Sequence, residues 1–141
     1  MNKITYLLIA TSIAHSQINP NNIEIVRDQF GVPHIYAQTD AEVAYGLAWA
    51  NAEDDFTTIQ EAYLAGNAML SNHIGLKGAA ADFITQFIGS KSLIDEQIGT
   101  ISEDYMEVVE GYSQGLNAYA RNNPNKEHWR IYDGRLDSFS I

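Results

Sequence analysis

The densest group of chemistry-bearing side chains in this sequence is the acidic run Glu53, Asp54 and Asp55. Facing carboxylates can hold a metal ion or share acid and base roles. This run, however, lies in a segment of helical character, where successive side chains turn by about 100° and point apart. The three side chains therefore cannot converge on one metal. We expect one of them to be solvated and one or two to be satisfied by buried partners.

The histidines offer no better evidence of a reaction. His34 follows Pro33 in an extended segment, and we expect a hydrogen-bonded structural role for it rather than that of a base or ligand. His73, Asp82 and His128 are not spaced like metal ligands. The sequence also contains no G-x-S-x-G, no H-E-x-x-H and no glycine-rich phosphate loop. These residues alone predict a secreted α-rich domain and name no reaction.

Composition narrows the classes of partner. The chain has 141 residues, of which 45% are hydrophobic and 18% charged, which is enough for one small domain with a core. Its formal net charge of -10 repels phosphates and anionic lipid, so we expect neither nucleic acid nor a membrane surface as partner. There are no cysteines, which excludes disulfides, thiolate metal sites and a cysteine nucleophile.

The first residues have the pattern of a secretion signal. Lys3 precedes an apolar run, and Ala14 and Ser16 put small residues at the positions that signal peptidases prefer, before a cut at Gln17. The run is shorter than the about 20 apolar residues of a membrane-spanning helix. The alternative is a buried N-terminal strand or helix. We interpret residues 1–16 as a signal peptide and 17–22 as a polar linker, which predicts a periplasmic or secreted protein.

Two extended runs follow, at residues 23–28 and 32–37, and they predict a β-hairpin or a bent strand pair. Isoleucine, valine and tyrosine dominate them, and Pro33 excludes a helix. Gly31 can take a positive φ in the turn between them. Because Pro33 cannot donate to a ladder, its strand is expected at an edge or at a bulge.

The rest of the chain predicts helices. Thr39 and Glu42 have the spacing of a capping box, so a long helix is expected over residues 40–65. Gly46 lies inside it, where its expected use is to let another backbone come close. One apolar face of this helix is predicted from Val43, Leu47, Ala50, Ile59 and Tyr63.

Two further helices and one ambiguous segment complete the prediction. Residues 79–88 predict a shorter helix, broken at 89–92, and residues 93–98 fit no single element. Ser102 is expected to cap a last helix that stops at Asn122. A stripe of apolar and tyrosine side chains lies along one side of that helix, which predicts that this side faces the core or an interface. Its members are Tyr105, Val109, Tyr112, Leu116 and Tyr119.

Three stretches together resemble the α-chain of the penicillin acylase (penicillin amidase) family. They are RDQFGVPHIYA at residues 27–37, AYGLAWANAEDD at 44–55 and GYSQGLNAY at 111–119. The resemblance spans residues 23–126. It implies an α+β chain, mostly helical with an N-terminal β-hairpin, that forms part of a four-layer αββα N-terminal-nucleophile hydrolase. It also implies a precursor that cuts itself into α- and β-chains, and a small acyl-amide substrate.

By this resemblance no catalytic residue lies in this chain, because the serine nucleophile begins the β-chain and is expected beyond Ile141. Arg27 and Asp28 are interpreted as a structural charge pair, and His34 and Asp54 as buried polar residues near the interface with the β-chain. The resemblance implies no cofactor here and leaves calcium open for the full-length protein. The motif residues expected to be structural are Arg27, Asp28, Gly31, Pro33, His34, Gly46, Glu53, Asp54, Gly111, Tyr112, Gly115 and Asn117.

Two departures from the family pattern bear on function. Penicillin-cleaving members usually carry A-Q-D-R where this chain has AEDD at residues 52–55, and the acidic form is nearer to the acyl-homoserine-lactone and lipopeptide acylases. Residues 127–141 diverge from the pattern, as in a truncated or frameshifted product. The alternative from a different class is a free-standing, secreted helical binding module without catalysis.

Overall fold

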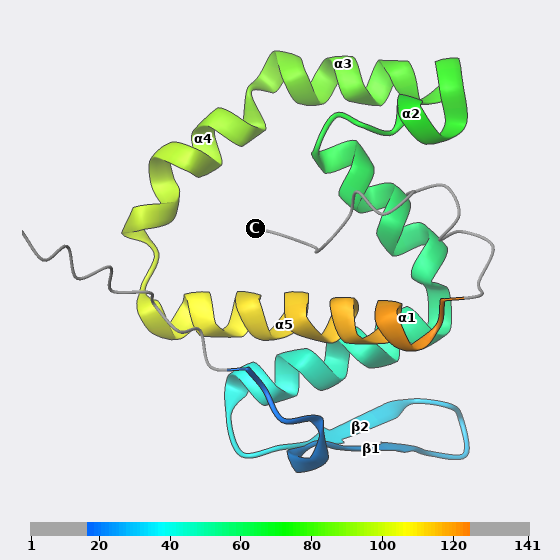
Figure 1. Ribbon diagram of the computed structural model, residues 1–141, viewed down its shortest axis with the longest axis vertical. Coiled ribbons are helices and arrows are strands. Elements are labelled where there is room, and N and C mark those ends of the chain that lie inside the picture. The colour runs from blue at the N-terminus through cyan, green and yellow to red at the C-terminus, as the bar shows by residue number, and fades with distance from the viewer. Residues whose placement is uncertain (1–16, 125–141) are drawn as a thin grey trace, which may run out of the picture.

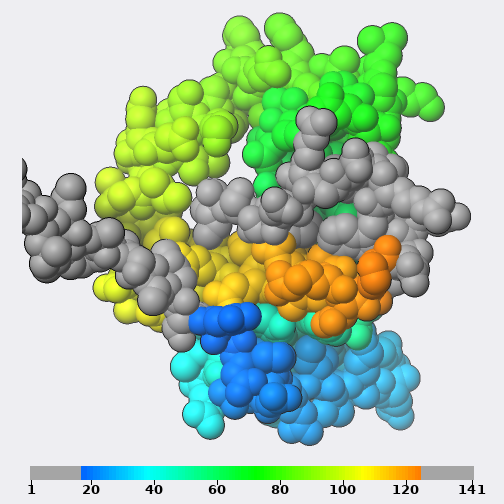
Figure 2. Space-filling view, viewed as in Figure 1, coloured from blue at the N-terminus to red at the C-terminus, as the bar shows by residue number. Residues whose placement is uncertain are grey.

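The computed structural model describes residues 17–124, so the predicted signal peptide and the divergent tail lie outside the described residues. A β-hairpin occupies one end, and the first half of helix α1 lies between it and helix α5 (Figure 1). The second half of α1 turns away from α5. Residues 67–101, here called the arch, then lead back to the start of α5. In the space-filling view the arch projects from the α1–α5 pair (Figure 2).

The hairpin follows the sequence prediction. Strand β1 (Glu24–Arg27) pairs antiparallel with β2 (Pro33–Tyr36), with Ile25 opposite Ile35. Gly31 has a φ of +82° in the turn, which is the left-handed region where glycine carries no steric penalty. This two-stranded sheet consists only of edge strands, so Pro33 is at an edge as predicted.

Helix α1 (Asp40–Gly66) begins as predicted but contains an unpredicted kink. The Thr39 side chain accepts from the Glu42 N–H at 3.2 Å, and Glu42 accepts from the Thr39 N–H at 3.1 Å. At Asp55 the backbone leaves the helical region, with φ -155° and ψ 76°. Asp55 Oδ1 accepts the N–H of Thr58, so this residue ends one helix and caps the next.

Helix α5 (Glu103–Asn122) packs along the first half of α1 through small residues. A Cβ added to Gly111 or Gly115 would overlap the carbonyl oxygens of Ala41 and Tyr45 respectively. The two backbones therefore touch, and larger residues at these positions would separate them. The core around this contact consists of Ala48, Ala52, Phe56, Leu116, Tyr119 and Ala120.

The predicted apolar face of α1 is wrong for two of its members. Val43 is 38% exposed and Leu47 42% exposed. The small residues Ala48 and Ala52 face α5 in their place, because the close approach of the helices leaves no room for branched side chains. The expected role of Gly46 is also corrected: the Ile35 and Ile23 side chains of the hairpin, not another backbone, approach it.

The stripe on α5 and its predicted cap are confirmed only in part. Tyr119 and Leu116 are buried, whereas Tyr105 is 61% exposed and lies outside the core. Ser102 occupies the N-cap position with extended backbone, but its hydroxyl makes no capping hydrogen bond within the described chain.

The arch is more helical than predicted. It contains α2 (Ser71–Ile74), η2 (Gly75–Gly78), α3 (Ala79–Ile88), α4 (Ser90–Gln97) and η3 (Ile98–Thr100). The bounds of α3 match the prediction. The predicted break at residues 89–92 is wrong, because Gly89, at φ +72°, ends α3 in one residue and α4 begins directly after it. The ambiguous residues 93–98 therefore lie mostly in a helix.

The start of the arch is held by a buried carboxylate. Asp82 on α3 accepts the backbone N–H groups of Leu70 and Ser71, both at 2.8 Å. The Ser71 hydroxyl and these N–H groups lower the pKa of Asp82. Asp82 therefore ties α3 to the start of α2.

The arch also exposes large apolar side chains. Phe83 and Phe87 stack with ring centroids 6.1 Å apart and are 68% and 81% exposed. We give the name α3–α4 apolar face to the exposed large apolar side chains of these two helices: Phe83, Ile84, Phe87, Ile88, Leu93 and Ile94. Among residues 17–124, no helix is both long and apolar enough to cross a bilayer.

Candidate functional site

Three motif residues of the hairpin turn and of α1, Gly31, Glu53 and Asp54, meet around the Arg27 guanidinium. Arg27, at the end of β1, contacts Asp54 Oδ1 at 2.9 Å and Glu53 Oε2 at 3.2 Å. The same group donates to the carbonyl of Gly31 at 2.8 Å and to that of Ala50 at 3.3 Å. Bonding to the two carboxylates raises the pKa of Arg27. One side chain thus fastens the hairpin turn to α1 just before its kink.

This geometry corrects the predicted pairing of Arg27 with Asp28. Asp28 serves the turn instead: its Oδ1 accepts the N–H of Phe30 at 2.8 Å and of Val32 at 3.0 Å. Its Oδ2 lies 3.5 Å from His34 Nε2. The two backbone bonds, followed by the histidine, lower the pKa of Asp28. Arg27 and Asp28 are thus both structural, but each has other partners.

His34 and Asp54 are exposed within this chain. Their side chains are 50% and 59% accessible. The resemblance to the acylase family predicts that both are buried at an interface with a β-chain. That burial stays a prediction, since this chain alone does not provide it.

The members of the acidic run bind different partners, each with a structural role. Glu53 accepts from Trp49 Nε1 at 3.0 Å as well as from Arg27. Asp55 accepts from the Thr58 hydroxyl at 2.6 Å, beside its bond to the Thr58 backbone. Part of the run does have partners, but the prediction that these are buried is wrong, since the Arg27 side chain is 31% exposed. Glu53 and Asp54 converge on its guanidinium despite being adjacent.

The described chain offers no metal centre. No group of three or more histidine, aspartate or glutamate residues within residues 17–124 could hold an ion. His73 Nε2 lies 3.9 Å from Glu61, and Asp82 is committed to backbone N–H groups. His128 lies outside the described residues.

The third motif lies on α5 and positions that helix. Gly111 and Gly115 form the close contact with α1 described above. The Tyr112 hydroxyl accepts from Asn51 Nδ2 at 3.3 Å, a hydrogen bond that no sequence pattern indicates. Asn117 lies on another side of the helix, at a cavity. The glycine spacing of four was the signal for a close helix pair, and it could have been read as such.

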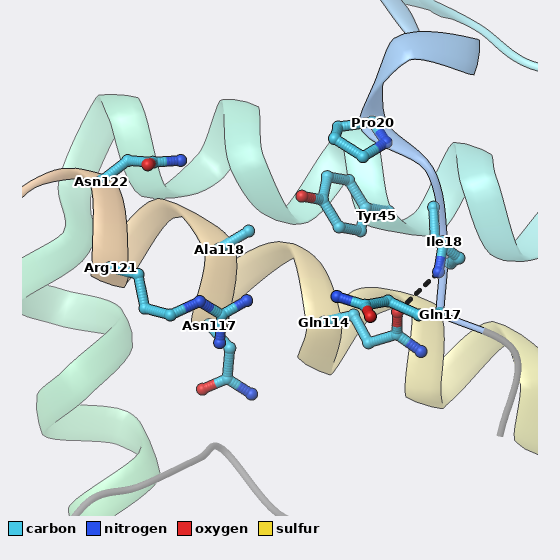
Figure 3. A pocket seen from close by; sticks show the side chains of 9 residues that line it. All are labelled: Gln17, Ile18, Pro20, Tyr45, Gln114, Asn117, Ala118, Arg121 and Asn122. Atoms are coloured by element: carbon cyan, nitrogen blue, oxygen red, sulfur yellow. Dashed lines mark hydrogen bonds between the residues drawn. The ribbon is translucent and has the colours of Figure 1, made fainter. Parts of the chain in front are cut away.

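That cavity has a volume of about 470 Å³ and lies between the N-terminal segment, α1 and α5 (Figure 3). Ile18 closes one side, with its N–H donated to Gln114 Oε1 at 3.0 Å. Burial raises the pKa of Tyr45 there. The cavity was not predictable from the sequence, because its wall depends on how residues 17–20 pack against α5. Its lining residues are Gln17, Ile18, Pro20, Tyr45, Gln114, Asn117, Ala118, Arg121 and Asn122.

The chemistry of the cavity is that of a polar recess and not of a hydrolytic site. Arg121 is the charged residue in its lining, and the lining holds no serine, histidine or carboxylate that could act as nucleophile and base. The described residues thus define a mostly helical α+β chain with an N-terminal hairpin, built around structural motifs.

Comparison with known proteins identifies this architecture. Residues 22–136 match the family model described as Penicillin amidase, so the chain belongs to the penicillin amidase family. A solved structure of similar fold is the thermostable penicillin G acylase from Alcaligenes faecalis. It superposes with a TM-score of 0.67 at 25% identity, covering 79% of this chain and 62% of that one. The α+β prediction and the predicted family are both confirmed.

Two groups of curated relatives are similar to this chain. Penicillin G acylase of Escherichia coli is 28% identical over 106 residues, which cover 75% of this chain and 12% of that protein. Acyl-homoserine lactone acylase PvdQ of Pseudomonas syringae pv. syringae is 25% identical over 116 residues, covering 74% and 15% respectively. This chain therefore spans only a small part of the length of the relatives it matches.

Proposed function

We propose that this chain is the N-terminal part of a secreted acylase that hydrolyses the amide bond of an acylated substrate. Membership of the penicillin amidase family supports the hydrolase class. The matches to penicillin G acylase and to acyl-homoserine lactone acylases support an acyl-amide substrate. The sequence AEDD at residues 52–55 favours a longer acyl chain, of the acyl-homoserine-lactone or lipopeptide type, over penicillin.

The observation that carries this proposal is the amount of apolar surface that the chain leaves open. The six side chains of the α3–α4 apolar face are each 53–81% exposed, and soluble monomers rarely leave large apolar patches open. The hairpin adds to this surface: one face packs on Gly46, whereas Val26 and Tyr36 on the other are 44% and 59% exposed. A larger protein, with further strands beside the hairpin and a partner on the arch, would cover these surfaces.

In the proposed enzyme this chain builds the scaffold and a β-chain performs the reaction. The hydroxyl of a serine at the start of the β-chain attacks the amide carbonyl, and its own α-amino group acts as base. The acyl group passes to the serine, the amine leaves, and water then releases the acid. Arg27 and its carboxylate partners hold the hairpin in place within a four-layer αββα fold. Calcium, if the whole protein binds it, belongs to residues beyond this chain.

The experiment compares the 141-residue chain with the product of its gene read beyond codon 141. Alone, the purified chain should hydrolyse neither penicillin G nor a long-chain acyl-homoserine lactone, because it lacks the nucleophile. The longer product should cleave itself at a junction with serine on its carboxyl side and should hydrolyse the lactone.

Two results would contradict the proposal. Hydrolytic activity that co-purifies with the short chain would show a catalytic site inside residues 1–141. Treatment with a serine-directed inactivator is the control for contaminating enzymes. An intact gene that ends at codon 141, with a cooperative monomer as its product, would favour the free-standing binding module.

A further inference from the structure

The two strands of the hairpin each have one edge without a neighbouring strand. Within residues 17–124 the sheet contains only β1 and β2. A free edge presents a row of backbone N–H and C=O groups that can pair with a further strand. In Figure 1, β1 forms the side of the hairpin that faces away from α5. We call this side the β1 edge.

The register of the hairpin shows which backbone groups point toward these edges. Asp28 donates its N–H to the carbonyl of Val32 at 3.1 Å, so these two residues form a hydrogen-bonded pair at the turn. In antiparallel strands such pairs alternate with pairs whose N–H and C=O groups point away from the partner strand. The next pair, Arg27 with Pro33, therefore directs its backbone groups outward.

The two edges differ in their hydrogen-bond donors because of Pro33. By the same alternation, Ile25 and Ile35 also direct their backbone groups outward. The β1 edge thus offers two N–H groups, those of Ile25 and Arg27. Within β2, Pro33 has no N–H, so Ile35 carries the one outward donor. Proline on an edge strand discourages pairing with a further strand, so the β1 edge is the better suited of the two.

The side chain of Arg27 does not block the β1 edge. Charged side chains on an edge strand commonly protect it from pairing. The Arg27 guanidinium, however, is held against α1 by Asp54 Oδ1 at 2.9 Å and Glu53 Oε2 at 3.2 Å. Ile25 lies on the same face of β1, where it points toward Gly46 of α1. The backbone groups of both residues therefore stay open to a neighbouring strand.

We propose that the β1 edge is an interaction surface for an extended strand of the β-chain; this inference rests on the proposed function. The added strand bonds to the outward N–H and C=O groups of Ile25 and Arg27, and β2 remains an end of the sheet. Ile25 points toward α1, whereas Val26 points to the opposite face and is 44% exposed. In a four-layer fold both faces are covered, so we expect apolar side chains at consecutive positions of the added strand.

The test is amide hydrogen exchange in the longer gene product, the one that should contain the β-chain. We expect the amides of Ile25 and Arg27 to exchange as slowly as that of Val26, which is bonded inside the hairpin. The amide of Ile35 should exchange about tenfold faster or more, because it has no partner strand. Slow exchange at Ile35 together with fast exchange at Ile25 and Arg27 would overturn the proposal, as would fast exchange at all three.

Two matched variants test the same difference through stability. Ile25→Pro and Ile35→Pro each remove an isoleucine that lies near Gly46 and an N–H that makes no bond within the hairpin. In the longer product Ile25→Pro should lower the urea midpoint more than Ile35→Pro, because it alone removes a bond to the added strand. Equal midpoints, or a lower one for Ile35→Pro, would overturn the proposal. Exchange in the wild type decides the matter if either variant fails to fold.

Activity separates this proposal from the proposed function. A longer product that hydrolyses the lactone but leaves the Ile25 and Arg27 amides open would overturn the role of the β1 edge alone. An inactive product in which these amides are protected would support the β1 edge and overturn the proposed hydrolysis. Protection that rises with concentration in the 141-residue chain alone would assign the edge to a second copy, and would overturn the β-chain as its partner.

Discussion

Replacing Gly115 by alanine tests whether the backbones of α1 and α5 touch as described. The new Cβ would lie 2.8 Å from the Cβ of Ala48 and 3.0 Å from the carbonyl carbon of Tyr45, and closer still to the Tyr45 oxygen. Carbon atoms normally pack at about 3.5–4.0 Å. The two helices must therefore separate, because the backbone atoms of Tyr45 cannot rotate away as the end of a side chain could.

Two opposing effects set the size of the change. Overpacking of a tight interface costs about 1–3 kcal/mol, and contact with backbone places this site in the upper half of that range. Alanine favours a helix over glycine by about 1 kcal/mol, which offsets part of the cost. We expect a net loss of about 1.5 kcal/mol in the stability of the α1–α5 interface. This corresponds to a change of about tenfold in an opening equilibrium.

Hydrogen exchange of the α5 amides measures this opening directly. We expect these amides to exchange about tenfold faster in Gly115→Ala than in the wild type. The control is Gly66→Ala at the end of α1, where a Cβ meets nothing within 4 Å. Gly66→Ala should leave the exchange rates of the α5 amides unchanged, or raise the stability of the protein by a few tenths of a kcal/mol. Unchanged or slower exchange in Gly115→Ala would refute the backbone contact.

The remaining predictions concern caps and titrating groups. Asp55→Ala should destabilise the second half of α1 by about 1 kcal/mol because Asp55 caps it, whereas Asp55→Asn should retain most of the cap; amide exchange at Thr58 is the measurement. The pKa values of Asp28, Glu42 and Asp82 are lowered on folding from ordinary values of 3.8, 4.5 and 3.8. Below those values the unfolded chain binds more protons than the folded one, so stability that is present above pH 4.5 is lost as the pH falls through the folded pKa values. Circular dichroism at acid pH should show this loss of folded protein. Asp82→Asn should weaken the pH dependence of stability, because it removes one of the three titrating groups. Stability that rises on acidification would contradict the lowered pKa values of these carboxyl groups.

Features that depend on local sequence were predicted well. The capping box at Thr39, the positive φ of Gly31 and the bounds of α3 each follow from a few neighbouring residues. The kink at Asp55 was missed, although an aspartate followed by Thr58 is a capping signal, because the surrounding alanine-rich sequence also favours one continuous helix.

Features that depend on distant partners were not predictable from one sequence. Val43 and Leu47 fit an apolar stripe on helical spacing, but which face of α1 is buried was decided by the glycines of α5. The candidate site shows the same limit. The sequence presents Arg27 and the acidic pair 53–54 as separate features, and only the hairpin packing on α1 brings them within 3.2 Å.

The pairing of α1 with α5 also has a consequence for the order of folding. Ala41 meets Gly111 and Tyr45 meets Gly115, so the partners in each contact lie 70 positions apart in the chain. Contacts of such long sequence separation pay the entropy of closing a large loop before they gain any burial. A growing chain can therefore form its hairpin and separate helical turns early. It cannot assemble its main core until the last motif has been synthesised. Until then the face of α1 that carries Ala48 and Ala52 stays exposed, because α5 is not yet there to cover it.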